Sequence, residues 1–248
     1  MNLTTLTDFL FGHYSEVLLF GSVIAGAIMV EIFKTKKSKN IQLLLTFSGA
    51  YLLAVSVLHL LPLIFKDNAN EHIGLCILGG FLIQILLEYF SQGIEHGHFH
   101  KSNVIPFSVL ISLCLHALLE GVPLGGGLDQ HSHAHSHAHD ALLAGIVLHK
   151  IPVAIVLMTF FLQSNMPKQK AYFYLLLFAL MTPIGVFAGS FFTTLANYHN
   201  EIMAMVIGIF LHISTTILFE SSDGHKFSTQ KILAIIVGAI IVMLSDLL

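Results

Sequence analysis

The chain consists mainly of long apolar runs that short polar clusters interrupt at regular intervals. A transmembrane helix needs about 20 predominantly apolar residues to cross the hydrocarbon core of a bilayer, and most of the runs have about that length. Cutting the chain at the polar clusters gives eight segments, at 10–33, 41–65, 72–91, 104–125, 141–162, 171–195, 201–220 and 230–248. The pattern therefore predicts eight transmembrane helices.

The composition agrees with this pattern. Hydrophobic residues make up 55% of the 248 residues and charged residues only 10%, with a mean hydropathy of +0.83. Such a chain is too apolar for an ordinary soluble domain. We expect an all-α integral membrane protein with a single transmembrane domain over residues 1–248, surrounded by the lipid bilayer. The formal net charge of −3 is too small to indicate a nucleic-acid partner.

The lysines indicate an orientation. Lysine accounts for all 11 basic residues, and the connections between the predicted helices place them unevenly. One side of the membrane receives Lys34, Lys36, Lys37, Lys39, Lys101, Lys168, Lys170, Lys226 and Lys231. The other side receives only Lys66, while Lys150 falls inside a segment. Because lysine-rich connections stay in the cytoplasm, both termini are expected outside it.

Two connections are rich in histidine. The outer one, at 126–140, holds an alternating tract of His131, His133, His135, His137 and His139. Such tracts bind metals weakly, so we interpret this loop as an antenna that raises the local ion concentration, with a passive solvated loop as the alternative. A short cytoplasmic loop at 92–103 carries three further histidines.

Ionisable residues inside the predicted helices are few, and metal-ligand types predominate among them. His116 and Glu120 stand four residues apart in the fourth segment, which stacks them on one helical face. His149 precedes Pro152 in the fifth segment. Proline has no N–H to donate, so the carbonyl four residues before it can turn toward an ion or water.

These three side chains are candidate metal ligands. Imidazole and carboxylate suit zinc, iron or manganese, and three protein ligands leave an open position through which an ion can exchange. The alternative is that each histidine is only a hydrogen-bonded packing residue. Lys150, next to His149, could form a salt bridge with Glu120 or Glu88, or its ammonium could lie where a second cation would bind.

Further polar residues could act along a pathway or as accessory ligands. His59 precedes Pro62 in the second segment, and His212 and Glu220 belong to the seventh. Glu88 lies near the inner end of the third segment. For His59 and His212, a hydrogen bond that ties two helices together is an equal alternative.

Four motifs, taken in order, resemble the ZIP (Zrt/Irt-like protein) family of metal transporters over nearly the whole chain. They are His59-Leu60-Leu61-Pro62, His116 to Gly121, His149 to Pro152, and Thr182-Pro183-Ile184-Gly185 followed by Gly189. The resemblance implies extracytoplasmic termini, a three-two-three arrangement of helices with inverted repeats, and inward movement of zinc and often of iron, manganese or cadmium. It also implies that His116, Glu120 and His149 are ligands of the main site.

The chain departs from family members that bind two adjacent metals. Where those members carry ligands, this chain has Ala117, Lys150, Val153 and Thr182. Lys150 also supplies a fixed positive charge, so a single-metal site is the consistent interpretation. The chain resembles the branch of the family with His-Lys-x-Pro in the fifth helix, and water or His59 might complete the site.

The function predicted from the sequence is divalent transition-metal transport into the cytoplasm, with the metal as substrate, no cofactor and no catalytic residues. The alternatives are an intramembrane metal-dependent hydrolase, since a metal with an open position also activates water, a haem carrier, and a metal sensor without flux. The expected location is a bacterial inner membrane, and a homodimer is left open.

Overall fold

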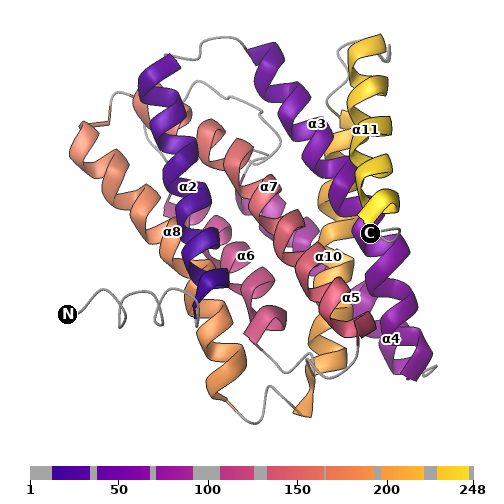
Figure 1. Ribbon diagram of the computed structural model, residues 1–248. Coiled ribbons are helices and arrows are strands. Elements are labelled where there is room, and N and C mark those ends of the chain that lie inside the picture. Colours follow the sequence, from indigo (N-terminus) through magenta and orange to yellow (C-terminus); the bar gives the residue numbers. More distant parts are fainter. Residues whose placement is uncertain are drawn as a thin grey trace, which may run out of the picture.

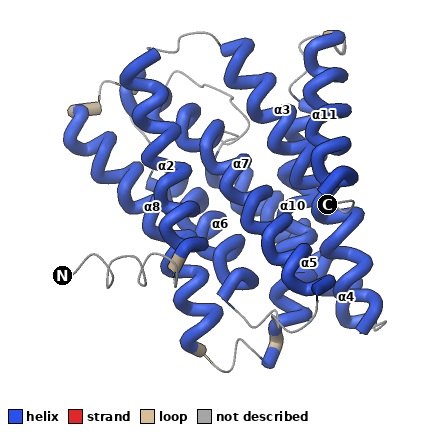
Figure 2. The backbone as a smooth tube through the Cα atoms, viewed as in Figure 1, coloured by secondary structure: helices blue, strands red, loops and turns tan. Residues whose placement is uncertain are grey.

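The structure is a computed structural model that describes residues 13–33, 38–67, 71–91, 107–125, 133–164, 166–192, 197–220 and 228–245. Every regular element in these ranges is a helix (Figure 2). The helices are α2 (Tyr14–Phe33), α3 (Ser38–Val55), a π turn η1 (Ser56–Leu60), α4 (Leu61–Asp67), α5 (Glu71–Ser91), α6 (Phe107–Gly125), α7 (His133–Gln163), α8 (Lys168–Phe191), α10 (His199–Glu220) and α11 (Thr229–Ser245). The all-helical prediction is confirmed for the described residues.

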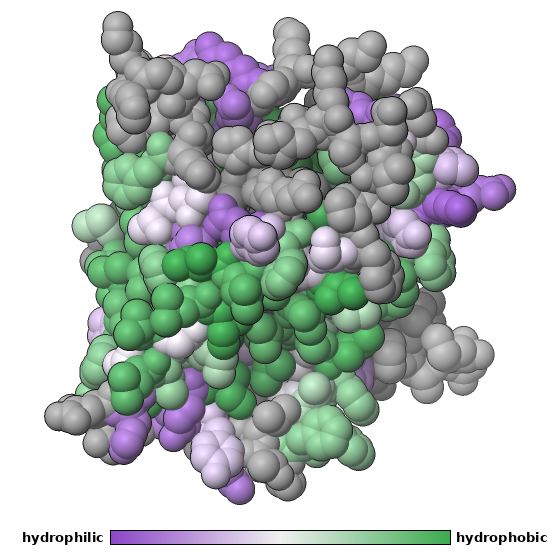
Figure 3. All heavy atoms as spheres, turned by 180° about the vertical axis from the view of Figure 1, so that it is seen from behind, coloured by the Kyte–Doolittle hydropathy of each residue, from purple (hydrophilic) through white to green (hydrophobic). Residues whose placement is uncertain are grey.

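Seven helical spans are long and apolar enough to cross a membrane, and α3, η1 and α4 together form one of them. The C-terminal α11 is a shorter apolar helix. Apolar side chains also cover much of the outside, for example Leu75, Leu78 and Leu82 on α5, which are 63%, 54% and 55% exposed. Figure 3 shows hydrophobic atoms gathered at mid-height of one face, with hydrophilic atoms above and below them. A belt of this kind suits contact with lipid.

The helices pack as two groups of four (Figure 1). In the first group α6 packs on α8, and α2 packs on α7 and α8. In the second group α5 packs on α10, and α3 packs on α11 and α10. Contacts of α3 with α7 and of α5 with α6 join the groups. The helix α7 contacts α2 and α8 in its own group and α3 in the other group. Its membrane span is 78% buried.

Glycines allow α6 and α8 to approach each other closely beside the candidate site. A Cβ on Gly121 of α6 would lie 2.3 Å from the Thr182 carbonyl oxygen of α8. A Cβ on Gly185 of α8 would lie 2.2 Å from the Leu118 carbonyl oxygen of α6. Any larger residue would push the helices apart, so the two glycines fix how near α8 stands to the residues of α6.

One helix start differs from the sequence prediction by more than a few residues. The helix α7 begins at His133, so His133, His135, His137 and His139 belong to its first turns rather than to the predicted loop at 126–140, while His131 lies outside the described residues. Alanine alternates with these polar residues and favours helix, so the segment extends the apolar helix that follows. The predicted loop at 92–103 lies outside the described residues. The other helix ends agree with prediction to within a few residues wherever they are described.

Candidate metal centre

The helix α6 brings His116 and Glu120 together. Their four-residue spacing places them on one face, and His116 Nε2 lies 3.4 Å from Glu120 Oε2. Both residues are buried, with exposed fractions of 3% and 1%. His116 stands near the middle of α6, and Glu120 lies one turn closer to the end of that helix at Gly125.

The helix α7 supplies the next two residues, His149 and Lys150. His149 is 2% exposed, and its ring centroid lies 6.5 Å from that of His116, with the two rings perpendicular. Pro152 stands within the same helix, three residues further on. The structure therefore places His116, Glu120 and His149 in one buried region, and their binding of a common metal stays a prediction.

Lys150 occupies the Glu120 side of this region. Its side chain is 2% exposed, and its ammonium forms an ion pair with Glu120 Oε1. The same Nζ lies 4.7 Å from the centroid of the Phe178 ring of α8. Thr182, fully buried one turn further along α8, also lies beside the carboxylate. The buried positive charge is thus balanced by a carboxylate and by an aromatic face.

Of the four positions that the resemblance matches to ligands of two-metal members, two are apolar here. Ala117 is fully buried and Val153 is 4% exposed, so both fill the interior without offering a metal-binding atom. Within the described ranges, no group of three His, Cys, Asp or Glu side chains lies close enough together to hold a metal. The Glu120 carboxylate is instead directed to Lys150. A metal would need the histidines and Glu120 to converge further, with Lys150 released.

Sequence reasoning missed Phe178 as a partner of this site. Phe178 lies four residues before Thr182 on α8, so the two share a helical face. That spacing was the available signal, but an apolar residue in an apolar helix gives no indication that a cation will lie over its ring.

A second polar pair lies in the other group of helices. His212 Nε2 of α10 stands 2.5 Å from Glu88 Oε2 of α5, and the two side chains are 13% and 19% exposed. The Phe81 ring packs edge-on against His212, with centroids 4.9 Å apart. The sequence treated Glu88 and His212 as separate accessory residues, and the structure pairs them. This matches the alternative in which His212 ties two helices together.

His59 lies in the π turn η1, which packs against α10 and α7. The N–H of Leu61 bonds to the carbonyl of Ser56, five residues earlier, and Pro62 follows. The backbone is therefore irregular just before Pro62, and π turns are frequent at functional sites. Glu220 ends α10, and its side chain lies outside the described part of the structure.

Comparison with known proteins now adds to this geometry. Residues 91–246, more than half of the chain, match the model of the family described as "ZIP Zinc transporter". The chain belongs to the ZIP family. The matched range begins at the end of α5 and includes α6, α7 and α8, which carry the candidate site. The resemblance read from the motifs is thus confirmed at the level of the family. ZIP family members are transporters, not enzymes, and the apolar helices agree with an integral membrane protein.

Curated relatives of this ZIP protein include zinc transporter ZIP9 of Xenopus tropicalis and zinc transporter ZIP9-A of Xenopus laevis. Each is 23% identical over 122 residues, which is 48% of this chain and 39% of the relative. The match therefore spans about two fifths of the length of these relatives. Both are frog proteins, so they give no support to the predicted bacterial inner membrane.

Proposed function

We propose that this ZIP protein transports a divalent transition metal, zinc first, across the membrane into the cytoplasm. The observation that carries the proposal is the burial of His116, Glu120 and His149 in one region of two membrane-spanning helices, from which the three side chains would move closer together to bind one ion. Burying such groups in a membrane is energetically costly, so their presence there indicates a functional site. Nitrogen and carboxylate oxygen are ligands that zinc accepts, and iron, manganese and cadmium are further proposed substrates.

Lys150 has a defined part in this proposal. Its ammonium pairs with Glu120 in the absence of metal, and it compensates the buried carboxylate. An arriving metal brings its own positive charge, so it can replace Lys150 at the carboxylate without leaving Glu120 uncompensated. The proposed site therefore holds one metal at a time, in keeping with the apolar Ala117 and Val153.

The proposed orientation follows from the lysines, and the proposed inward direction of transport from the family resemblance. Their uneven distribution favours extracytoplasmic termini, and the three-two-three arrangement with inverted repeats is proposed on the family resemblance. The start of α7, with its histidines, then lies on the outer side, where it would collect metal. Glu88, His212 and Glu220 would act closer to the cytoplasm. The short connections favour a bacterial inner membrane, and a homodimer remains compatible with this scheme.

Zinc flux into proteoliposomes tests the proposal. We expect flux in the parent protein, and at least a tenfold loss in His116→Ala and in His149→Ala, since even an outer-sphere partner of a metal ligand changes affinity by about tenfold or more. The matched control is His72→Ala, because His72 is an exposed histidine at the start of α5. This variant should transport at the parent's rate.

Each other outcome points to a different conclusion. Unchanged flux in both site variants, with normal insertion, would exclude these histidines as ligands. Binding of zinc without any flux in the parent would favour the sensor. Hydrolysis of a lipid or peptide by a parent that moves no metal would favour the hydrolase, an alternative that family membership does not support.

A further inference from the structure

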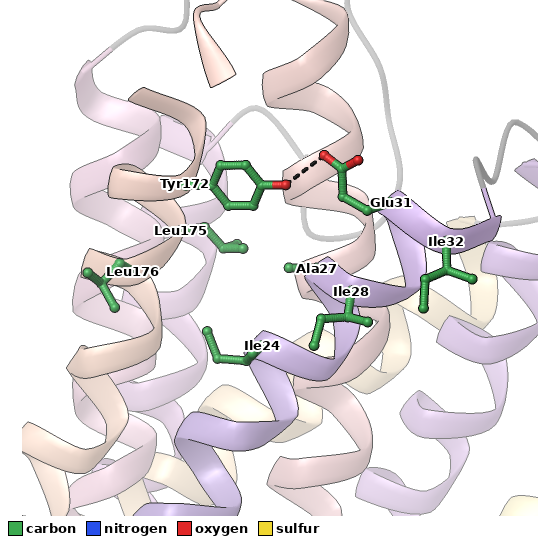
Figure 4. Close-up of a pocket in the computed structure, with 8 residues that line it drawn as sticks. All are labelled: Ile24, Ala27, Ile28, Glu31, Ile32, Tyr172, Leu175 and Leu176. Carbon is green, nitrogen blue, oxygen red and sulfur yellow. Dashed lines mark hydrogen bonds between the residues drawn. The ribbon is translucent and has the colours of Figure 1, made fainter. Parts of the chain in front are cut away.

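An apolar groove lies between α2 and α8 in the first helix group. It has a volume of about 360 Å³. Figure 4 shows α2 contributing Ile24, Ala27, Ile28 and Ile32, while α8 contributes Leu175 and Leu176. Ile28 and Leu176 are 51% and 41% exposed, so the groove opens to the outside of the helices rather than to the interior.

One end of the groove is polar and charged. The Tyr172 hydroxyl donates a hydrogen bond of 2.6 Å to Glu31 Oε1 (Figure 4). The Lys168 ammonium lies 3.4 Å from the same oxygen. The side chains of Lys168 and Glu31 are 69% and 38% exposed, so both charges face outward. The groove therefore presents one positive and one negative group side by side.

The position of this polar end matches the depth of lipid headgroups. Glu31 stands two residues before the end of α2, and Lys168 begins α8. Both helices are long and apolar enough to cross a membrane. Ile24 lies seven residues before Glu31, about 10 Å deeper along the helix. The charges thus lie where the membrane-spanning segments begin and end, and the apolar lining continues into the hydrocarbon.

We propose that this groove binds one phospholipid of the phosphatidylethanolamine class. One of the two acyl chains lies between Ile28 and Leu176. The lipid ammonium pairs with Glu31, and the lipid phosphate pairs with Lys168. The argument is charge complementarity, because this headgroup also carries one positive and one negative group in close succession.

Other common headgroups fit these charges less well. An anionic headgroup without an ammonium gains Lys168 but faces the Glu31 carboxylate, which repels it. The trimethylammonium of phosphatidylcholine has no N–H to donate to a carboxylate, so it forgoes a charge-assisted hydrogen bond. The groove therefore distinguishes lipids by headgroup although it holds them by the acyl chain.

A tryptophan reporter tests the proposal, since the chain contains no tryptophan. Ile28→Trp places the only indole in the groove. Phe187→Trp places it on the same α8 but outside the groove, at a residue that is 61% exposed. Each full-length variant is reconstituted in bilayers of phosphatidylcholine mixed with phosphatidylethanolamine, with bromine on the acyl chains of one lipid or the other. Quenching then gives the relative affinity of the two lipids at each reporter.

We expect phosphatidylethanolamine to be favoured about threefold at Ile28→Trp, which is within the range for exposed charge pairs, and not at all at Phe187→Trp. Adding Glu31→Gln or Ala27→Phe to the first reporter should abolish the preference, the former by removing the ammonium's partner and the latter by filling the groove. Lys170→Gln, a change at an exposed lysine on the same helix, should leave the preference intact.

Equal quenching by the two lipids at Ile28→Trp would overturn the proposal. A preference for brominated phosphatidylglycerol in a parallel series would also overturn it, because that result would make Lys168 the only recognised charge. Persistence of the preference in Glu31→Gln would refute the role of the carboxylate even if the groove held lipid.

Discussion

The two helix groups each contain a pair of opposite or potentially opposite charges, and the pairs differ in how their charge is balanced. In the first group Glu120 pairs with Lys150, and the two side chains are 1% and 2% exposed. In the second group Glu88 pairs with His212 at the less buried values of 19% and 13%. The first pair keeps a permanent cation beside its carboxylate, whereas the second has a cation only when His212 is protonated.

This difference indicates what each pair can do. A carboxylate buried with a lysine is compensated at neutral pH without any other ion, so an incoming metal must compete with an ammonium. A carboxylate beside a histidine at a less buried helix interface has no such permanent cation. The first pair suits selection of a strongly held substrate, and the second suits attachment of α5 to α10.

The largest expected effect comes from removing the permanent cation. Lys150→Met should lower the free energy of unfolding by about 3–5 kcal/mol, because it leaves the buried carboxylate of Glu120 without its partner. Denaturant titration in mixed micelles measures this change, with Lys170→Met at an exposed site as the matched control. Adding Glu120→Gln to Lys150→Met should recover much of the loss, since no charge then remains to be compensated.

The same variant tests whether a metal can take the place of Lys150. Zinc should raise the midpoint of thermal unfolding of Lys150→Met more than that of the parent, since it restores the missing positive charge without a competitor. A smaller zinc effect in Lys150→Met than in the parent would show that Lys150 helps to build the metal site.

A smaller effect is expected from the backbone contact that holds the second pair together. A Cβ on Gly80 of α5 would lie 1.8 Å from the Met205 carbonyl oxygen of α10, whereas a Cβ on the adjacent Gly79 has no atom within 4 Å. Gly80→Ala should therefore destabilise the protein by about 1–3 kcal/mol through overpacking. Gly79→Ala should be neutral or slightly stabilising, because alanine favours helix. Equal unfolding free energies for the two variants would contradict the close packing of α5 on α10.

The smallest effect is expected at the second pair itself. His212→Gln should reduce the free energy of unfolding by about 1–2 kcal/mol, as for loss of one partly buried hydrogen bond. His72→Gln, at an exposed position, provides the baseline. If His212→Gln were as damaging as Lys150→Met, the contrast between the two pairs would not hold.

Much of the fold followed from the sequence because lipid leaves the backbone few choices. Runs of about 20 apolar residues must become helices when no water is present to bond the backbone. The predicted segments 72–91 and 201–220 differ from α5 and α10 by at most two residues at their starts. The start of α7 was harder to predict, because a tract of alternating histidine and small residues has no apolar period that marks it as helix.

The shared face of His116 and Glu120 could be predicted from the sequence, but the partner of Lys150 could not. The spacing of His116 and Glu120 placed them on one face, and the structure places Nε2 and Oε2 3.4 Å apart. The choice of Glu120 over Glu88 as the partner of Lys150 depends on which helices are neighbours. Helix packing decides which helices are neighbours, for example through the contact of Gly121 with α8. The hydrophobic pattern of the sequence does not reveal such contacts.

The π turn of the second membrane span gives that span two rotational phases. A turn closed over five residues contains one residue more than the regular repeat, so the helix beyond it is rotated by roughly 100° relative to an uninterrupted α-helix. The part before the turn packs on α11 and α7 as well as on α10, and α4 beyond it packs on α10. The number of residues in this span therefore decides which face of α4 each side chain occupies, as much as the residue types do. Deleting one residue at Val57, whose side chain is 46% exposed, would let this turn close as regular α-helix and would keep α4 on its present face.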